Sequence, residues 1–76
     1  MMKAWTDAVC TELNLPADVN IEVILNVAKV AAHTIERPAA PVTTFLLGML
    51  VAGGMDVNEA AAKIQDLAQN WPASAE

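Results

Sequence analysis

The sequence has few of the side chains from which metal and catalytic sites are usually built. It contains one cysteine, one histidine, one arginine and no tyrosine. A lone cysteine cannot form an internal disulfide, and no second cysteine or histidine cluster supplies a metal-ligand set. We therefore predict no metal, no cofactor and no catalytic residue. Cys10, between Asp7 and Glu12, is expected to be structural and to stay reduced.

Positive charge is also scarce. Four basic side chains stand against nine acidic ones, which gives a net charge of −5, and no two basic residues are adjacent. Proteins bind a nucleic-acid backbone through clustered lysine and arginine. We therefore predict no nucleic-acid binding.

Long apolar runs are missing as well. The nearest approach to a membrane span, Val42 to Ala52, has about eleven residues, whereas a bilayer core requires ~20. Lys3 is followed, after Ala4, by Trp5, Thr6 and Asp7, which is unlike the apolar run of a secretory signal. We expect no membrane segment and a cytoplasmic location.

The composition is that of a small folded protein. Hydrophobic residues make up 55% of the 76 residues and charged residues 17%, which is too apolar for a disordered segment. The chain is near the lower size limit at which one core suffices. We predict an all-α, compact four-helix domain with short loops over residues 1–72, followed by a frayed tail over residues 73–76.

The first two helices are predicted from apolar periodicity and end signals. Their expected limits are Lys3 to Leu13 for the first helix, and for the second a start after Asp18 or Asn20 and an end near Ile35 or Glu36. Asn14 tolerates the left-handed conformation that ends helices. The second helix carries one polar stripe and is otherwise apolar, so most of it is expected to be buried. The stripe is Glu22, Asn26, Lys29, His33 and Glu36.

The third helix is expected to begin with Pro41 at its first position and to end at Gly53 and Gly54. Pro38 and Pro41 should keep the residues before them out of helical conformation, which predicts a rigid corner. From Phe45 to Ala52 the helix has no polar side chain. A helix that is apolar all round must be covered, and three short helices cannot easily do so. We therefore predict an interface formed by Phe45, Gly48, Met49 and Leu50.

The fourth helix should start after Asp56, three residues before Glu59, and should end before Pro72. Its apolar stripe is Ala60, Ile64, Leu67, Ala68 and Trp71. We expect Leu67 to be buried at the middle of this stripe. Trp5 and Trp71 are expected to close the first helix against the fourth.

The corner between the second and third helices is the one candidate ligand site. His33 and Arg37 are four residues apart, and Thr43 and Thr44 follow at the start of the next helix. Free amides at a helix N-terminus favour an anion, and an arginine is a strong phosphate donor. One interpretation is an anion site formed by His33, Arg37, Thr43 and Thr44. The other is that these side chains only satisfy the ends of the two helices.

The sequence also resembles a known family. The resemblance rests on Trp5, Glu12-Leu13-Asn14-Leu15, Trp71 and above all Ala32-His33, Arg37-Pro38-Ala39-Ala40-Pro41 and Thr43-Thr44-Phe45-Leu46. These residues resemble a small actinobacterial helical domain family of unknown function. Its members occur alone or fused behind the nucleotidyltransferase domain of molybdenum cofactor guanylyltransferase-like proteins. The chain departs from the family pattern at Asn26, Lys29 and Thr34.

The function expected from these observations is that of a non-catalytic accessory or interaction module. The resemblance implies a link to molybdopterin-guanine dinucleotide biosynthesis and a nucleotidyltransferase-like partner. The alternatives are an anion- or cofactor-binding module at the Arg37 corner, and a homodimeric structural protein.

Overall fold

The computed structural model describes residues 2–16 and 18–72, and these residues contain four helices and no strand. The helices are α1 (Met2–Glu12), α2 (Ile21–Thr34), α3 (Ala39–Ala52) and α4 (Val57–Gln69). The predicted all-α four-helix class is confirmed. The predicted tail, residues 73–76, lies outside the described residues.

Two helix ends have the capping geometry that the sequence predicts. Asn14 has a φ of 57°, and the Leu15 amide donates to the Cys10 carbonyl at 2.8 Å. Gly54 has a φ of 111°, and the Met55 amide donates to the Leu50 carbonyl at 3.1 Å. A left-handed residue followed by this backward hydrogen bond satisfies carbonyls that the helix end leaves free. Both stop signals are confirmed.

Two helix starts are capped by predicted side chains. Asn20 Oδ1 accepts a hydrogen bond from the Val23 amide at 3.2 Å. Asp56 Oδ2 accepts from the amides of Asn58 and Glu59 at 3.0 and 3.2 Å. Each cap satisfies amides that have no partner within the first turn.

Loss of the Asp56 cap should lower stability by a measurable amount. We expect Asp56→Ala to reduce the free energy of unfolding by about 1 kcal/mol, within the 0.5–2 kcal/mol typical of lost caps. The measurement is the urea midpoint. Asp18→Ala is the matched control, because Asp18 is exposed and lies outside the helices. An equal loss in both variants would show that the effect is one of net charge.

The start of α3 differs from the prediction. The helix begins at Ala39 and not at Pro41, with Pro38 as its N-cap residue. The expectation that Ala40 leaves the helical region before Pro41 is therefore wrong. Pro41 is tolerated as the third residue of the helix because amides of the first turn have no intrahelical partner. The proline thus forfeits no hydrogen bond of the helix.

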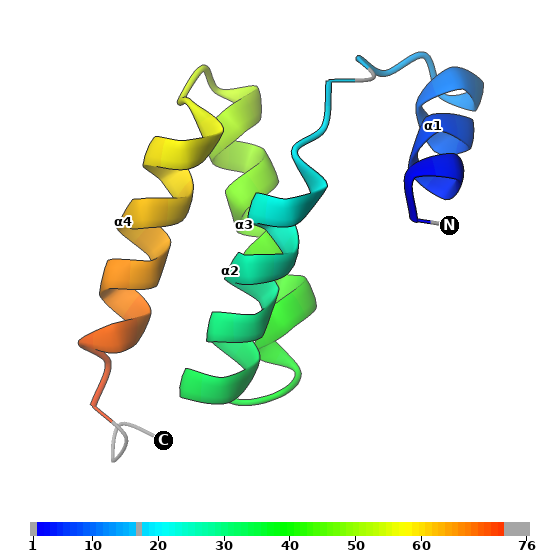
Figure 1. Cartoon of the computed structure of the whole chain (residues 1–76). Helices are drawn as coiled ribbons and strands as arrows, with labels where there is room; N and C mark the ends of the chain where they lie inside the picture. The colour runs from blue at the N-terminus through cyan, green and yellow to red at the C-terminus, as the bar shows by residue number, and fades with distance from the viewer. Residues whose placement is uncertain (1, 17, 73–76) are drawn as a thin grey trace.

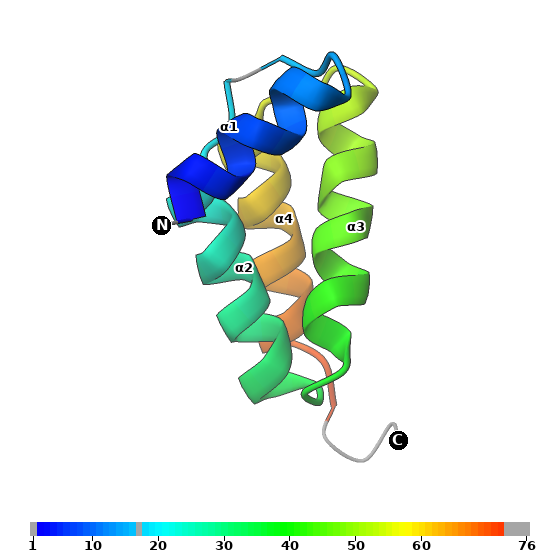
Figure 2. The same cartoon turned by 90° about the vertical axis from the view of Figure 1, so that its right-hand side faces the viewer.

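Helices α2, α3 and α4 pack together, and α1 lies on one side of this three-helix unit. Figures 1 and 2 show α1 on the side of α2 and α3 that faces away from α4. The molecule measures 42 × 25 × 16 Å along its principal axes. The connection over residues 13–20 is exposed at every residue that the structure describes.

The core that joins α2, α3 and α4 is small. Val27 and Leu47 are the two large side chains with almost no exposed surface. Around them lie buried alanines, of which Ala60 and Ala61 belong to the same cluster. Small residues let helix backbones approach closely, but they bury little apolar area. The expectation that most of α2 is buried is wrong, because only Val27 and Ala31 are buried there.

The predicted tryptophan contact between the first and fourth helices is also wrong. Trp5 is 67% exposed and Trp71 is 48% exposed. The buried residue of α1 is Cys10, which lies well over a right angle around the helix from Trp5. Since α1 and α4 lie on opposite sides of α2 and α3 (Figure 1), the two indoles cannot meet.

The fourth helix buries Ala60 and Ala68 of the predicted stripe but not Leu67. It packs through Ala60, Ala61 and Ala68, and Leu67 is 68% exposed. The prediction that Leu67 is buried is therefore wrong. The small alanines make the contact of α4, and its larger side chains Leu67 and Trp71 lie at the edge of that contact.

Candidate functional site

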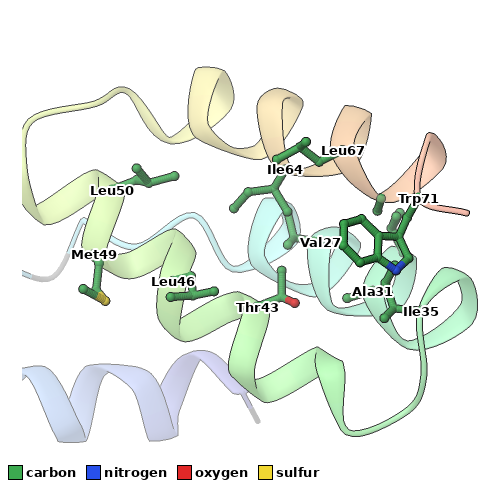
Figure 3. Close-up of a pocket in the computed structure, with 12 residues that line it drawn as sticks. Val27, Ala31, Ile35, Thr43, Leu46, Met49, Leu50, Ile64, Leu67 and Trp71 are labelled. Carbon is green, nitrogen blue, oxygen red and sulfur yellow. The ribbon is translucent and has the colours of Figure 1, made fainter. Parts of the chain in front are cut away.

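An apolar groove lies between α3 and α4, with α2 as its floor. We call it the α3–α4 groove; its volume is about 720 Å³. The larger side chains at its edges are Leu46, Met49, Leu50, Leu67 and Trp71. Figure 3 shows the Trp71 ring at the end of the groove where Ala31 and Ile35 lie. No charged side chain lines the groove among the described residues, and Thr43 supplies a hydroxyl.

The groove is open because of how each helix is buried. On α3 only Leu47 is buried. Leu46, Met49 and Leu50 therefore lie beside the core rather than in it. On α4 the alanines make the contact and Leu67 stays at the edge. The result is a hollow with exposed apolar walls. A contiguous apolar surface of this kind usually marks an interaction site.

The predicted interface residues of the third helix are all exposed. Met49 and Leu50 line the groove, while Phe45, 69% exposed, lies on the outer side of α3. Gly48 is not part of the groove lining, and a Cβ built there meets nothing within 4 Å. The expectation that helix 3 cannot be enclosed by the other three helices is confirmed for Phe45 to Val51, since Leu47 is the one buried residue among them.

The four residues of the predicted anion site differ in their exposure and in their hydrogen-bond partners. His33 and Arg37 are exposed. Thr43 points toward the groove (Figure 3), and the Thr44 hydroxyl donates to the Pro41 carbonyl at 3.0 Å. The anion interpretation stays a prediction.

The backbone amides at the start of α3 also affect whether an anion can bind there. The Ala39 amide donates to the Glu36 carbonyl at 2.9 Å, and the Ala40 amide donates to the Arg37 carbonyl at 3.1 Å. The next residue, Pro41, has no amide hydrogen. The first three positions of α3 therefore offer an anion no free donor, which favours the interpretation that the corner only completes two helix ends.

We expect Arg37→Ala to leave the fold nearly unchanged. The side chain is exposed, and surface changes of this kind usually alter stability by no more than about 0.5 kcal/mol. The checks are the urea midpoint and the amide shifts of Thr43 and Thr44 during a phosphate titration. A phosphate-dependent shift present in the parent and lost in Arg37→Ala would establish the anion site. A loss of more than about 3 kcal/mol would instead identify Arg37 as one half of a buried pair.

Helix α1 carries a second, smaller hollow that the sequence did not indicate. It has a volume of about 350 Å³ and is lined by residues of α1 and its end alone, Trp5, Ala8, Val9, Glu12 and Leu13. On the same helix Lys3 Nζ lies 2.8 Å from Asp7 Oδ2, and this hydrogen bond raises the pKa of Lys3 above its ordinary value. The pair is exposed, so it contributes little to stability.

Metal ligation and membrane insertion find no support in the described residues. Over residues 2–16 and 18–72, no three histidine, cysteine, aspartate or glutamate side chains are grouped as metal ligands would be. In the same residues, no helix has both the length and the apolar character required to span a bilayer. The polar stripe of α2, including Asn26 and Lys29, is exposed to solvent along its whole length.

Comparison with known proteins identifies the family. A family model described as a domain of unknown function, DUF6457, matches residues 1–76. The chain belongs to the DUF6457 family. Searches of curated proteins and of solved structures gave no significant match. The resemblance to a domain family of unknown function is thereby confirmed. For this DUF6457 domain, the taxonomic range and the fusion to molybdenum cofactor proteins stay predictions.

Proposed function

We propose that this DUF6457 domain is a non-catalytic protein-interaction module and that the α3–α4 groove is its docking surface. The observation that carries the proposal is the exposure of large apolar side chains on both walls of one uncharged groove. Leu46 and Met49 stand on one wall and Leu67 and Trp71 on the other. A groove of this shape and chemistry suits the apolar face of a helix.

The proposal that the domain is non-catalytic rests on the absence of buried polar side chains among the described residues. Among the described residues no polar or charged side chain is buried. Catalytic acids, bases and nucleophiles are usually held in clefts, where burial and neighbouring charges tune them. No titratable side chain lines the α3–α4 groove within the part of the chain that the structure describes. The groove thus supplies apolar contact and no acid–base chemistry.

An accessory role in molybdopterin-guanine dinucleotide biosynthesis belongs to the same proposal. A docking module is the type of domain that acts beside a nucleotidyltransferase, whether on a separate chain or fused to it. The support for this link is the sequence resemblance of the Ala32–Phe45 segment.

The proposal is tested by asking whether any protein covers Trp71. In a Trp5→Phe variant Trp71 is the one remaining tryptophan, so its emission and its quenching by acrylamide report on the groove. We expect quenching to fall when the groove is filled, either at high protein concentration or on addition of a molybdenum cofactor nucleotidyltransferase domain. If Trp71 stays equally accessible to acrylamide under both conditions, the groove is not a docking surface.

A further inference from the structure

We propose that the occupant of the α3–α4 groove is a second copy of this chain, bound about a two-fold axis so that α3 of each copy lies in the groove of the other. The inference rests on the proposed function and names its partner. It is carried by three properties of the face: its layout, its charge and its area.

The layout of the face is self-complementary. The outer side of α3, with Phe45 and Met49, forms an apolar ridge directly beside the groove, since Met49 and Leu46 belong to the groove wall. In a two-fold dimer both copies use the same surface, so the ridge of each copy lies against the groove of the other. Each ridge then fills the hollow of the other copy.

The charge distribution also favours a second copy. The chain has a net charge of −5, so two copies repel each other, and a contact between them adds least to this repulsion when it uses uncharged surfaces. Helix α3 contains no charged residue, and no charged residue lines the groove among the described residues. Two identical copies can therefore meet here without opposing like charges in the contact. A strongly basic or acidic partner would find no opposite charge in it.

The exposed area is large enough for a dimer contact. The chain exposes 5744 Å², whereas a compact monomer of this mass exposes about 4,450 Å². The difference of about 1,300 Å² is spread over the whole chain, and a standard interface covers about 800 Å² on each partner. A dimer contact of standard size is therefore within what the exposed surface can supply.

Helix α1 is the principal competing occupant of the groove. Its exposed apolar residues include Trp5 and Leu13, but Glu12 borders the hollow on the same side. In Figures 1 and 2, α1 lies on the far side of α2 and α3 from α4. To enter the groove of its own chain it would have to pass around the bundle, so a second copy is the simpler occupant.

The experiment has two parts, and both use the full chain. The first is sedimentation equilibrium of the parent, of Leu67→Lys and of the matched control Leu25→Lys. Leu67 and Leu25 are both exposed leucines in helices, but only Leu67 lines the groove. We expect the parent to dimerise, Leu67→Lys to weaken dimerisation on the order of 100-fold, and Leu25→Lys to dimerise as the parent does. Circular dichroism confirms that each variant is folded.

A second control addresses the glycine of α3. Gly48 is exposed and outside the groove lining, and a methyl group there meets nothing within the chain. We therefore expect Gly48→Ala to leave the dimerisation constant unchanged, although alanine is the better helix former. A strong loss of dimerisation in Gly48→Ala, with Leu67→Lys unaffected, would place the interface on the other flank of α3 and overturn the proposal.

The second part identifies the contact. In a sample mixed from isotope-labelled and unlabelled copies, we expect nuclear Overhauser effects between Met49 of one copy and Leu67 of the other. Effects between Trp5 and Leu67, within or between chains, would assign the groove to α1 and overturn the proposal. A monomeric parent whose Trp71 becomes protected only by the nucleotidyltransferase domain would overturn it too, while the interaction-module function would stand. A monomer with Trp71 accessible under all conditions would contradict both the dimer and the interaction-module function.

Discussion

The Leu47→Ala variant is expected to be largely unfolded, or close to it. Leu47 is 2% exposed and lies at the centre of the cluster formed with Val27, Ala60 and Ala61. Truncating a buried leucine costs about 2–5 kcal/mol. A domain of this size has a free energy of unfolding near the low end of the usual range, about 5 kcal/mol. One substitution therefore removes a large share of the total, which is measured as the urea midpoint at low protein concentration.

The matched control is Leu25→Ala in α2. The chemical change is the same, but Leu25 is 51% exposed and does not line the α3–α4 groove. Alanine also has the slightly better helix propensity, so stability should change by less than about 0.5 kcal/mol. Equal losses in the two variants would contradict the placement of the core at Leu47.

Enlarging Ala60 is expected to have the second-largest effect. Ala60 has no exposed surface and lies where α4 meets the core. A leucine there needs volume that a close helix contact lacks, and such overpacking typically costs 1–3 kcal/mol. We expect Ala60→Leu to lower the urea midpoint and to shift the amide resonances of α2 residues near Val27, because α4 must move away from α2.

The control for this variant lies two residues further along the same helix. Ala62 is exposed, so Ala62→Leu makes the same chemical change without entering the core. We expect it to leave the urea midpoint nearly unchanged. If Ala60→Leu were as stable as Ala62→Leu, the contact between α2 and α4 would be looser than the structure shows.

The helix ends could be predicted from the sequence because they depend on local chemistry. Asn14, Asn20, Gly54 and Asp56 each act through hydrogen bonds to residues a few positions away, and all four do so in the structure. The start of α3 was missed for a local reason as well. The restriction that Pro41 places on the preceding residue is a preference, and here Ala40 is helical all the same.

The orientation of α4 could not be predicted in the same way. Its apolar stripe is wide, and both Ala60 with Ala61 and Ile64 with Leu67 are possible centres of the buried face. The choice depends on how closely α2 approaches, which is a property of the packed molecule. Because alanine allows a closer approach, Leu67 and Trp71 are placed at the edge. The position of α1 is equally non-local, since the described residues of its connection are all exposed.

The candidate site was therefore predicted in part. The exposure of α3 was expected because three short helices cannot easily enclose a helix that is apolar from Phe45 to Ala52. The groove itself could not be foreseen, because its second wall consists of the α4 side chains that were expected to be buried. No pattern in the sequence distinguishes an apolar residue at the edge of a helix contact from one at its centre.

The most direct test of the account is the dependence of stability on protein concentration. The central claim is that the α3–α4 face is covered by a second copy, and the stability of such a dimer is inseparable from its concentration. Urea unfolding of the parent chain is measured at a low micromolar protein concentration and at a concentration 100 times higher. The midpoint should be higher in the more concentrated sample. The shift should correspond to about 2.7 kcal/mol for a 100-fold change, and Leu67→Lys should not show it. A parent midpoint that is the same at both concentrations would contradict the account.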